Sequence, residues 1–357
     1  MARRRGKTQN KRPGPITYRD AGVDIDQANA TLEQVKPLIR ATFTSHVAAD
    51  VGTFGAMFSL AEWAGRDSLL VTSVDSVGTK LMVARMMNQY NTVGQDLVNH
   101  CVNDILVQGA RPLFFMDYIA ADNLARELVG ELIEGLSAAC KEVGCALIGG
   151  EMAELPGMYR EGEYDLVGFI AGVVERSRAI AVRGDRIEPG DVLIGLASNG
   201  LHTNGYSLAR KLFFEIAGLP VDQFVPELNR TIGEELMRIH RCYAPAVLPL
   251  LEDLEMRGMA HITGGGLPDN LVRCLPEGCR AVVERGSWHV PAIFELIQDL
   301  GRVPDEDMYH TFNMGVGFML VVPEPAADEA ASRLSAAGET GYRIGRIESG
   351  DRGVQIV

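Results

Sequence analysis

A polar segment rich in glycine and proline, RGDRIEPGD at residues 183–191, divides this chain into two long stretches of alternating β-like and helix-like sequence. Segments of this composition commonly connect domains. A single hydrophobic core usually stops growing at roughly 250 to 300 residues, and the chain has 357. The sequence therefore predicts two domains that each mix helices and strands, at residues 16–184 and 185–357, after a separate tail at residues 1–15.

The charge distribution argues against broad nucleic-acid binding by the body of the chain. There are 34 Lys and Arg against 47 Asp and Glu, and the net charge of -13 repels a phosphate backbone. The opening MARRRGKTQNKR is basic. We interpret it as a solvated, disordered tail in preference to an arm that binds nucleic acid or a partner. It contains no apolar stretch, so it predicts neither a signal peptide nor a membrane anchor.

The six cysteines contain no C-x-x-C pair. Several lie in apolar segments, which favours buried thiols in a reducing, cytoplasmic setting. Cys274 and Cys279 could be drawn as metal ligands, but no second pair or histidine cluster in the sequence completes a zinc site with them.

Hydrophobic periodicity predicts the order of the main elements. In the first stretch a helix is expected to open near Asp26, SLLVTS indicates a strand, VDSVGTK a tight loop and LMVARMM a helix. TVGQDLVNHCVNDILVQGA predicts an amphipathic helix ending at Gly109, followed by strand, helix, strand and strand patterns up to residue 175. The second stretch alternates the strands DVLIGLAS and GFMLVVP with helices at GYSLARKLFFEIAG, VPAIFELIQDL and DEAASRLSAAG.

Polar residues that follow strands in the first stretch predict a magnesium-nucleotide site. Magnesium prefers oxygen ligands in octahedral geometry and leaves part of its shell for phosphate oxygens. Any one of these acids alone is more commonly a helix cap or a surface charge, so the prediction depends on their combination. The residues are Asp75, Lys80, Asp96, Asn103, Asp104 and Glu151.

The loop VDSVGTK can hold phosphate, although it is not a Walker A sequence and the chain has no convincing G-x-G-x-x-G after a strand. Gly78 lets the backbone come close to a ligand, Thr79 offers a hydroxyl and Lys80 supplies a positive charge.

In the second stretch, SNGLHTNGYSL and HITGGGLPDN are loops rich in glycine and asparagine. Their backbone amides suit phosphate or ribose oxygens. Equally, their glycines could serve only to make turns, with His202 and His261 as ordinary polar residues. No Ser-His-Asp order, Cys-His pairing or kinase signature can be assembled, so covalent protein catalysis has little support.

Several long motifs, in order from about Tyr18 almost to the C-terminus, resemble the phosphoribosylformylglycinamidine cyclo-ligase (AIR synthetase) family. They include YRDAGVDIDQAN, VDSVGTKL, GQDLVNHCVNDILVQGARPLFFMDY, GCALIGGEMAELPGMY, SNGLHTNGYSLARK, HITGGGLPDNLVRCLP and MYHTFNMGVGFML. The resemblance implies an α+β fold of two domains, in which the N-terminal domain builds a β-barrel with its copy in a homodimer and the C-terminal α/β domain packs beside it.

The resemblance also implies a reaction. ATP phosphorylates the formamide oxygen of formylglycinamidine ribonucleotide, and the neighbouring nitrogen then closes the ring to give aminoimidazole ribonucleotide, ADP and phosphate. Such a reaction needs electrostatic and positional catalysis more than a protein nucleophile. ATP and Mg²⁺ are the implied cofactors, and the implied partners are a small ribonucleotide and a second copy of the chain.

The resemblance assigns roles to residues of this sequence. We expect Asp75, Asp104 and Glu151 to hold Mg²⁺, with Lys80 contacting the transferring phosphate and His202 moving a proton. Residues expected to bind or border the nucleotides are Ser76, Gly78, Thr79, Lys80, Asp96, Asn103, Thr203, Asn204, Gly264, Gly265 and Gly266.

This chain departs from the family pattern in four loops. It has Ser76 where the family usually has glycine after the aspartate, Met152 where it has threonine, Thr53 in a usual GGFGA and Ala28-Asn29 in a usual AGN. Two alternatives follow: a related ATP-dependent enzyme such as a thiamine-phosphate kinase, selenophosphate synthetase or hydrogenase-maturation dehydratase, or a paralogue that binds nucleotide as a regulatory subunit. The N-terminal Cys or Sec expected of a selenophosphate synthetase is missing.

Overall fold

A computed structural model describes residues 16–21, 45–48, 56–61, 67–180 and 186–357. The predicted tail at residues 1–15, the helix expected near Asp26, the altered loops at residues 28–29 and 53, and the predicted boundary at Asp185 all lie outside the described residues. None of the helices in the described ranges is both long enough and apolar enough to span a bilayer.

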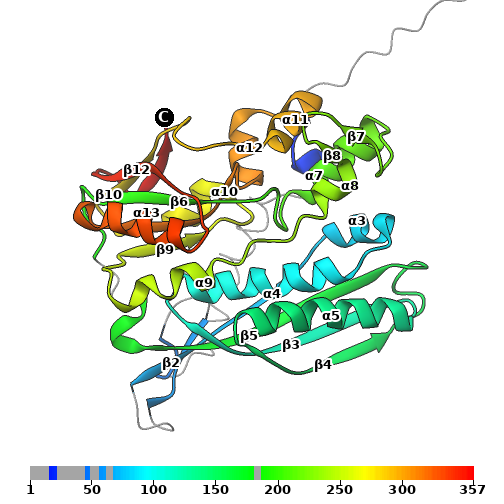
Figure 1. The fold of residues 1–357 in the computed structure, drawn as a ribbon, viewed down its shortest axis with the longest axis horizontal. Helices are drawn as coiled ribbons and strands as arrows, with labels where there is room; N and C mark the ends of the chain where they lie inside the picture. The colour runs from blue at the N-terminus through cyan, green and yellow to red at the C-terminus, as the bar shows by residue number, and fades with distance from the viewer. Residues whose placement is uncertain (1–15, 22–44, 49–55, 62–66, 181–185) are drawn as a thin grey trace, which may run out of the picture.

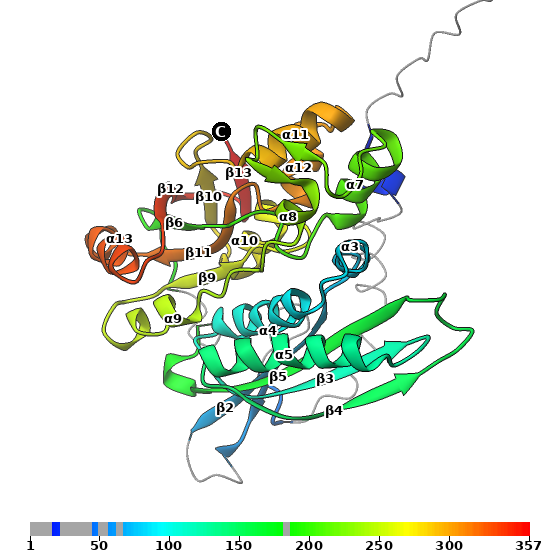
Figure 2. The same ribbon diagram turned by 45° about the vertical axis from the view of Figure 1, so that its right-hand side comes forward.

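The N-terminal half forms a five-stranded sheet in the order β1-β2-β5-β3-β4, with its helices on one face (Figures 1 and 2). All pairings are antiparallel except β3 with β4. Its elements are η1 (Arg19–Ala21), β1 (Ala56–Ser59), β2 (Ser68–Ser76), α3 (Lys80–Met87), α4 (Asn91–Leu106), β3 (Arg111–Ala121), α5 (Arg126–Glu142), β4 (Ala146–Glu154), β5 (Tyr164–Glu175) and η2 (Arg176–Arg178).

The C-terminal half builds a six-stranded mixed sheet in the order β13-β10-β12-β6-β11-β9, and a short ribbon of β7 and β8. Its strands are β6 (Val192–Ala197), β7 (Phe224–Val225), β8 (Arg230–Thr231), β9 (Gly258–His261), β10 (Cys279–Val283), β11 (Val316–Val322), β12 (Gly341–Ser349) and β13 (Gly353–Ile356). Its helical segments are α7 (Tyr206–Arg210), η3 (Lys211–Ile216), α8 (Ile232–Leu236), α9 (Ala244–Val247), η4 (Leu250–Glu252), α10 (Gly266–Leu271), η5 (Val272–Cys274), α11 (Ala292–Gly301), α12 (Asp305–Thr311), η6 (Glu324–Ala326) and α13 (Ala327–Ala336).

The strands and helices expected between residues 68 and 175 are confirmed, with one difference in detail there and one in the second half. The amphipathic helix α4 ends at Leu106, and Gly109 with φ +75° follows in a turn. The helix expected over GYSLARKLFFEIAG begins as α7 but continues as the π-helical turn η3. The prediction of two regions that each mix helices and strands therefore matches two separate sheets.

Helix α4 lies between the first sheet and the C-terminal half (Figures 1 and 2). It crosses α5 at very short range: a Cβ built on Gly135 would lie 1.9 Å from the carbonyl oxygen of Asn91, and one on Gly94 would lie 2.5 Å from that of Leu132. Glycine at both positions lets the two backbones approach this closely. The crossing holds α4 against the sheet and turns its remaining face toward the second domain.

The other face of the first sheet carries no described helix (Figures 1 and 2). One row of paired residues across that face reads Val74, Phe169 and Met116. Val74 is 61% exposed and Met116 39% exposed. This face is therefore apolar and open over at least three strands.

Candidate functional site

Four polar side chains of α4 form a stripe facing the C-terminal half. Asp96, His100, Asn103 and Asp104 are spaced by four, three and one residues, which places them on one side of a helix. All four are buried. Buried polar groups must find hydrogen-bond partners, and here most of these partners come from the second domain.

Lys80 forms a fully buried ion pair with Asp96 of this stripe. Its Nζ lies 2.8 Å from Asp96 Oδ2 and donates to the carbonyl oxygens of Arg238 at 2.6 Å and His202 at 3.3 Å. An ammonium has three protons to donate, so all three are taken. Burial lowers the pKa of Lys80 and raises that of Asp96, and their mutual attraction opposes both shifts. The expectation that Lys80 contacts phosphate is therefore corrected: in this structure it ties the two domains together, and Asp96 is its partner rather than a nucleotide contact.

His100 links the first sheet to the second domain. Its Nε2 lies 2.7 Å from Asp75 Oδ2, and its Nδ1 lies 2.8 Å from the hydroxyl oxygen of Thr203. Burial alone would lower the pKa of His100, but the carboxylates of Asp75 and Asp104 outweigh it and raise the pKa to about 9. Asp75 and Thr203, predicted from separate halves of the sequence, thus meet through a histidine that the sequence did not single out.

Asp104 is held by two groups. Ser73 Oγ donates to its Oδ2 at 2.9 Å, and His261 Nδ1 lies 2.8 Å from its Oδ1. His261, at the end of β9, in turn places its Nε2 3.1 Å from Nε2 of His240. Both carboxylate oxygens of Asp104 are therefore engaged by protein groups within a buried histidine cluster.

His202 lies against the same cluster but reaches none of its polar atoms. It has φ +61°, and its ring stacks on His240 with centroids 4.2 Å apart. Neither ring nitrogen has a hydrogen-bond partner among the described residues. Burial lowers the pKa of His202 well below its usual value. A neutral, enclosed imidazole argues against the predicted role in proton transfer.

The loop before α3 remains accessible. Gly78 has φ +66° and is exposed, and no atom lies within 4 Å of the position that a Cβ would occupy. Thr79 Oγ1 lies 3.1 Å from Ser207 Oγ, so this loop touches the start of α7. Gly78 can therefore present its backbone to a ligand at the point where the two domains meet, whereas the Ser76 N–H is bonded to Asp75 Oδ1.

The two glycine-rich loops of the second half lie side by side. A Cβ on Gly264 would be 3.5 Å from Asn204 Oδ1, and Gly264 is exposed. Gly265 and Gly266 have positive φ of +91° and +61°, and a Cβ on Gly266 would lie 1.7 Å from the carbonyl oxygen of Tyr309. Gly264 and Asn204 thus form an accessible edge, whereas Gly265 and Gly266 meet the packing demands of a tight turn.

Two of the three predicted magnesium ligands, Asp75 and Asp104, lie beside the same nitrogen of His100, whereas Glu151 lies apart from them within one chain. Glu151 occupies a row of paired residues with Tyr118, Val167 and Ser76, which places it three strands from β2, or roughly 14 Å at the usual strand spacing. Since Asp75 neighbours Ser76 on β2, it points to the opposite face of the sheet. Asp104 already has both oxygens occupied. The three acids therefore do not form one ligand set within a single chain. Asp75 is also engaged, by the Ser76 N–H and by His100 Nε2, but its side chain is 35% exposed.

Asn103 also has a fixed role. Its Oδ1 accepts from the backbone N–H of Tyr243 at 3.0 Å, and its Nδ2 donates to the carbonyl oxygen of Arg241 at 2.8 Å. It therefore supports the chain around His240 and is not free for a nucleotide. The i to i+4 spacing of Asp96, His100 and Asp104 could have indicated His100 from the sequence, but nothing local pointed to His240.

Two of the family departures lie in the described residues. The Ser76 N–H donates to Asp75 Oδ1 at 2.7 Å, a bond that any residue except proline could make at this position. Met152 is 54% exposed on the edge strand β4. Neither side chain fills the loop before α3.

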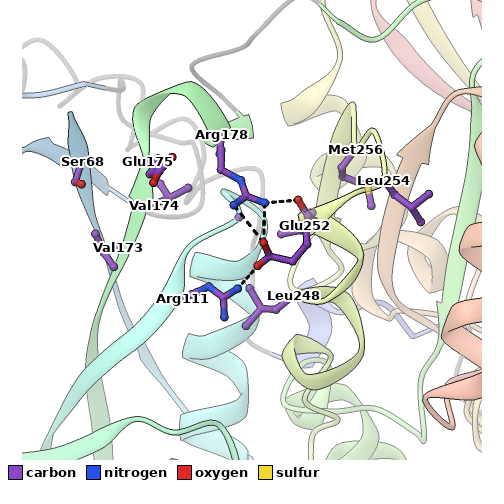
Figure 3. Close-up of a pocket in the computed structure, with 12 residues that line it drawn as sticks. Ser68, Arg111, Val173, Val174, Glu175, Arg178, Leu248, Glu252, Leu254 and Met256 are labelled. Carbon is purple, nitrogen blue, oxygen red and sulfur yellow. Dashed lines mark hydrogen bonds and ion pairs between the residues drawn. The ribbon is translucent and has the colours of Figure 1, made fainter. Parts of the chain in front are cut away.

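A separate cavity of about 340 Å³ lies at the other end of the domain contact (Figure 3). Arg111 and Arg178 from the first domain both pair with Glu252 from the second, and Arg178 Nη2 also donates to the carbonyl oxygen of Leu251 at 2.6 Å. None of the residues predicted for the site lines this cavity. It is bordered by an ion-paired domain contact rather than by the candidate site.

Comparison with protein families matches both halves of the chain. Residues 55–174 match the N-terminal domain of AIR synthase related proteins, and residues 188–357 match their C-terminal domain. The phosphoribosylformylglycinamidine cyclo-ligase of Syntrophotalea carbinolica is 50% identical over 346 residues, which cover 96% of this chain and 98% of that protein. The protein of that name from Thermoanaerobacter pseudethanolicus is 47% identical over 339 residues, covering 95% and 99%.

Solved structures share the fold at much lower identity. A thiamine-monophosphate kinase from Stenotrophomonas maltophilia K279a superimposes with a TM-score of 0.61 at 18% identity, covering 92% of this chain and 95% of that one. A hydrogenase maturation protein HypE in complex with ATP superimposes with a TM-score of 0.55 at 19% identity, covering 78% and 77%. At this identity the likeness establishes the two-domain α+β fold alone.

Proposed function

The chain belongs to the phosphoribosylformylglycinamidine cyclo-ligase family, and on that premise we propose that it converts formylglycinamidine ribonucleotide and ATP into aminoimidazole ribonucleotide, ADP and phosphate. The observation that carries this function is identity of 50% along 96% of the chain to a relative of that name. Both family domains are present. The protein is thus an ATP-dependent ligase of purine biosynthesis, and this reading takes precedence over a kinase or a regulatory subunit.

The accessible loops support a place for the two substrates. Gly78 and Thr79 supply open backbone and a hydroxyl at the start of α3, which suits ATP phosphates. Asn204 and Gly264 form the neighbouring edge on the second domain, which suits the ribonucleotide. Because Thr79 touches Ser207, three residues after Asn204, the two edges are close enough to hold reacting groups together.

We also propose that the enzyme uses Mg²⁺ and that Asp75 is one of the ligands of the ion. The Asp75 side chain is 35% exposed, and its neighbour Gly78 leaves room for a phosphate. An accessible carboxylate beside a phosphate loop fits the oxygen ligands that Mg²⁺ prefers. The bound ion would neutralise charge on the phosphates. Glu151 would enter such a site only from another chain.

The open sheet face supports a homodimer as part of this proposal. The apolar row of Val74, Phe169 and Met116 lies on a face with no described helix over it, and an exposed apolar patch of this kind marks a contact surface. We propose that a second copy of the chain covers this face, since its apolar row runs across three neighbouring strands. Val74→Arg should convert a dimer to a monomer in light scattering; a dimer that survives this charge would exclude the face.

A cytoplasmic location belongs to the same proposal. All six cysteines are free thiols, four of them buried, and free thiols persist in reducing compartments.

The experiment that tests the function measures two products together. Purified protein with Mg-ATP should release ADP only when formylglycinamidine ribonucleotide is added, with an equal amount of aminoimidazole ribonucleotide. Asp75→Asn should reduce kcat about 100-fold or more, and the matched surface change Asp328→Asn should leave it unaltered. ADP release without the aminoimidazole product would assign the chain to another reaction, and ligand binding without turnover would make it a regulatory subunit.

A further inference from the structure

The carboxylate of Asp75 is held from two sides by donors of the protein. The Ser76 N–H donates to Oδ1 at 2.7 Å, and Nε2 of His100 lies 2.7 Å from Oδ2. An ionised carboxylate offers about four acceptor positions on its two oxygens. Two of these positions are therefore filled, and the other two remain on a side chain that is 35% exposed. The protein thus fixes the plane of this carboxylate and leaves it able to bind a cation.

Asp75 is the hydrogen-bond partner of His100 Nε2. Asp104 Oδ2 lies 3.9 Å from the same nitrogen, which is too far for a hydrogen bond, and Ser73 Oγ donates to that oxygen at 2.9 Å. An ionised carboxylate accepts and does not donate, so the proton between Nε2 and Asp75 is carried by the imidazole. A neutral ring with its proton on Nε2 and a protonated ring both make this bond. The orientation of Asp75 therefore does not depend on the charge of His100.

The other nitrogen of His100 fixes the ring to the C-terminal domain. Its Nδ1 lies 2.8 Å from Thr203 Oγ1, and this hydroxyl lies 3.2 Å from Nδ1 of His240. A hydroxyl can both donate and accept, so Thr203 can bond to Nδ1 of His100 in either protonation state of that nitrogen. The His100 side chain is 5% exposed. Because the ring is buried and both of its nitrogens are engaged, strand β2 and the loop before α7 together set its orientation.

His100 thereby connects the two edges at which the substrates are proposed to bind. Asp75 lies near the end of β2, before the phosphate loop, and Thr203 directly precedes Asn204, which belongs to the ribonucleotide edge. Phosphoryl transfer requires that the metal, the phosphate and the attacking oxygen be placed accurately relative to one another. One imidazole bonded to both edges can supply that placement without touching a reacting atom.

We propose that His100 is a positioning residue, which holds the Asp75 carboxylate in the orientation that binds Mg²⁺ and relates it to the Thr203 loop of the other domain. The inference rests on the proposed function, in which Asp75 is a ligand of the ion. Loss of such a hydrogen-bond partner of a metal ligand lowers metal affinity by roughly 10- to 100-fold. His100 acts through Asp75, so its removal should change the binding of the metal first and the chemistry only as a consequence.

The test compares two replacements of His100 in the full chain. Glutamine can place an amide N–H where the Nε2–H lies and should keep the bond to Asp75, whereas leucine is of similar size and has no donor. Electron paramagnetic resonance measures the dissociation constant of Mn²⁺, which takes the same oxygen ligands as Mg²⁺, in the presence of a non-hydrolysable ATP analogue. His100→Leu should weaken Mn²⁺ binding about 10- to 100-fold, and His100→Gln should recover most of that loss.

Leu97→Ala separates positioning from a general loss of stability. Leu97 is fully buried on the same helix, but on the face toward the sheet. At a temperature where the variants are folded, Leu97→Ala should bind Mn²⁺ as the unaltered chain does, and Asp75→Asn should show the loss expected when the ligand itself is changed. Unaltered Mn²⁺ affinity in His100→Leu, or equal affinities in His100→Leu and His100→Gln, would overturn the positioning role.

A second pair of variants tests the contact from the other domain. Thr203→Val removes the hydroxyl that fixes Nδ1 of His100, so it should weaken Mn²⁺ binding, but less than His100→Leu does. Thr203→Ser keeps the hydroxyl and should retain the affinity. This comparison can be made even where His100→Leu does not fold, and equal affinities in the two Thr203 variants would overturn the link to the second domain.

Mn²⁺ affinity is measured without turnover, so the two proposals can fail separately. A chain whose Mn²⁺ affinity depends on His100 but which forms no aminoimidazole ribonucleotide keeps the positioning role and loses the proposed function. A chain that forms this product while His100→Leu binds Mn²⁺ normally keeps the function and loses the positioning role.

Discussion

Both faces of α4 are buried, but one face buries apolar side chains and the other buries polar ones. Toward the first sheet the helix buries apolar side chains, among them Leu97, Cys101 and Ile105. Toward the second domain it buries Asp96, His100 and Asp104. The apolar face is non-directional and tolerates small shifts, whereas each group on the polar face is held by a partner at a set distance and angle.

The comparison shows where positional precision arises in this protein. Hydrophobic burial fastens α4 to its own sheet and continues into the second domain, whereas the charged and hydrogen-bonded contacts between the domains are the directional ones. Loss of one partner in such a contact strongly destabilises the fold, because the other partner is left buried and unpaired. We therefore expect changes on the polar face to alter both stability and catalysis, and changes on the apolar face to alter stability alone.

The largest expected effect is on the buried ion pair. Lys80→Met should reduce the free energy of unfolding by about 3 to 5 kcal/mol, because Asp96 would stay buried without a counter-charge, with only the hydrogen bond from the His240 N–H. Urea unfolding measures the loss. The double variant Lys80→Met with Asp96→Leu should recover part of it, and a single variant as stable as the double would contradict the pairing argument.

The matching change on the apolar face is Leu97→Ala. Leu97 is fully buried against the sheet, and its removal should reduce the free energy of unfolding by about 3 kcal/mol through lost burial and a cavity. At temperatures where the variant is folded, kcat/KM should stay within about twofold of the unaltered enzyme. A tenfold loss of kcat/KM would break the distinction between the two faces.

The pH dependence of the free energy of unfolding tests the polar face of α4 through His100. The pKa of His100 rises from 6.5 to about 9 on folding, so its imidazolium stabilises the fold fully below about pH 6.5, and this contribution is lost as the pH rises through about 9. The loss should be at most about 3 kcal/mol. Chemical unfolding from pH 6 to pH 9.5 measures it, with His100→Gln as the control whose profile should be flatter; equal slopes would exclude His100 as the source.

The smallest expected effect concerns a single hydroxyl. Thr203→Val keeps the shape of the side chain but removes the oxygen that lies 2.8 Å from His100 Nδ1 and 3.2 Å from His240 Nδ1. The free energy of unfolding should fall by about 1 to 2 kcal/mol. Thr203→Ser should retain most of the stability, and no difference between the two variants would show that the hydroxyl is dispensable.

Sequence reasoning was strongest where the signal is local. The apolar spacing of α4 and the strand patterns at residues 68–73 and 165–175 predicted elements that the structure contains. It was weakest on the roles of polar residues. Lys80 was expected at a phosphate, yet it is buried against Asp96, and Glu151 was grouped with Asp75 although they lie on opposite faces of the sheet.

The sequence by itself determined the order of the described helices and strands, the two mixed halves and the family, because periodicity and long ordered motifs are properties of neighbouring residues. Only the tertiary structure decided which polar groups meet. His100, His240 and His261 come from segments separated by up to 161 positions along the chain, and no spacing in the sequence relates them. Their contacts arise because α4 is pinned to one sheet by its apolar face while its buried polar face must find its partners on the other domain.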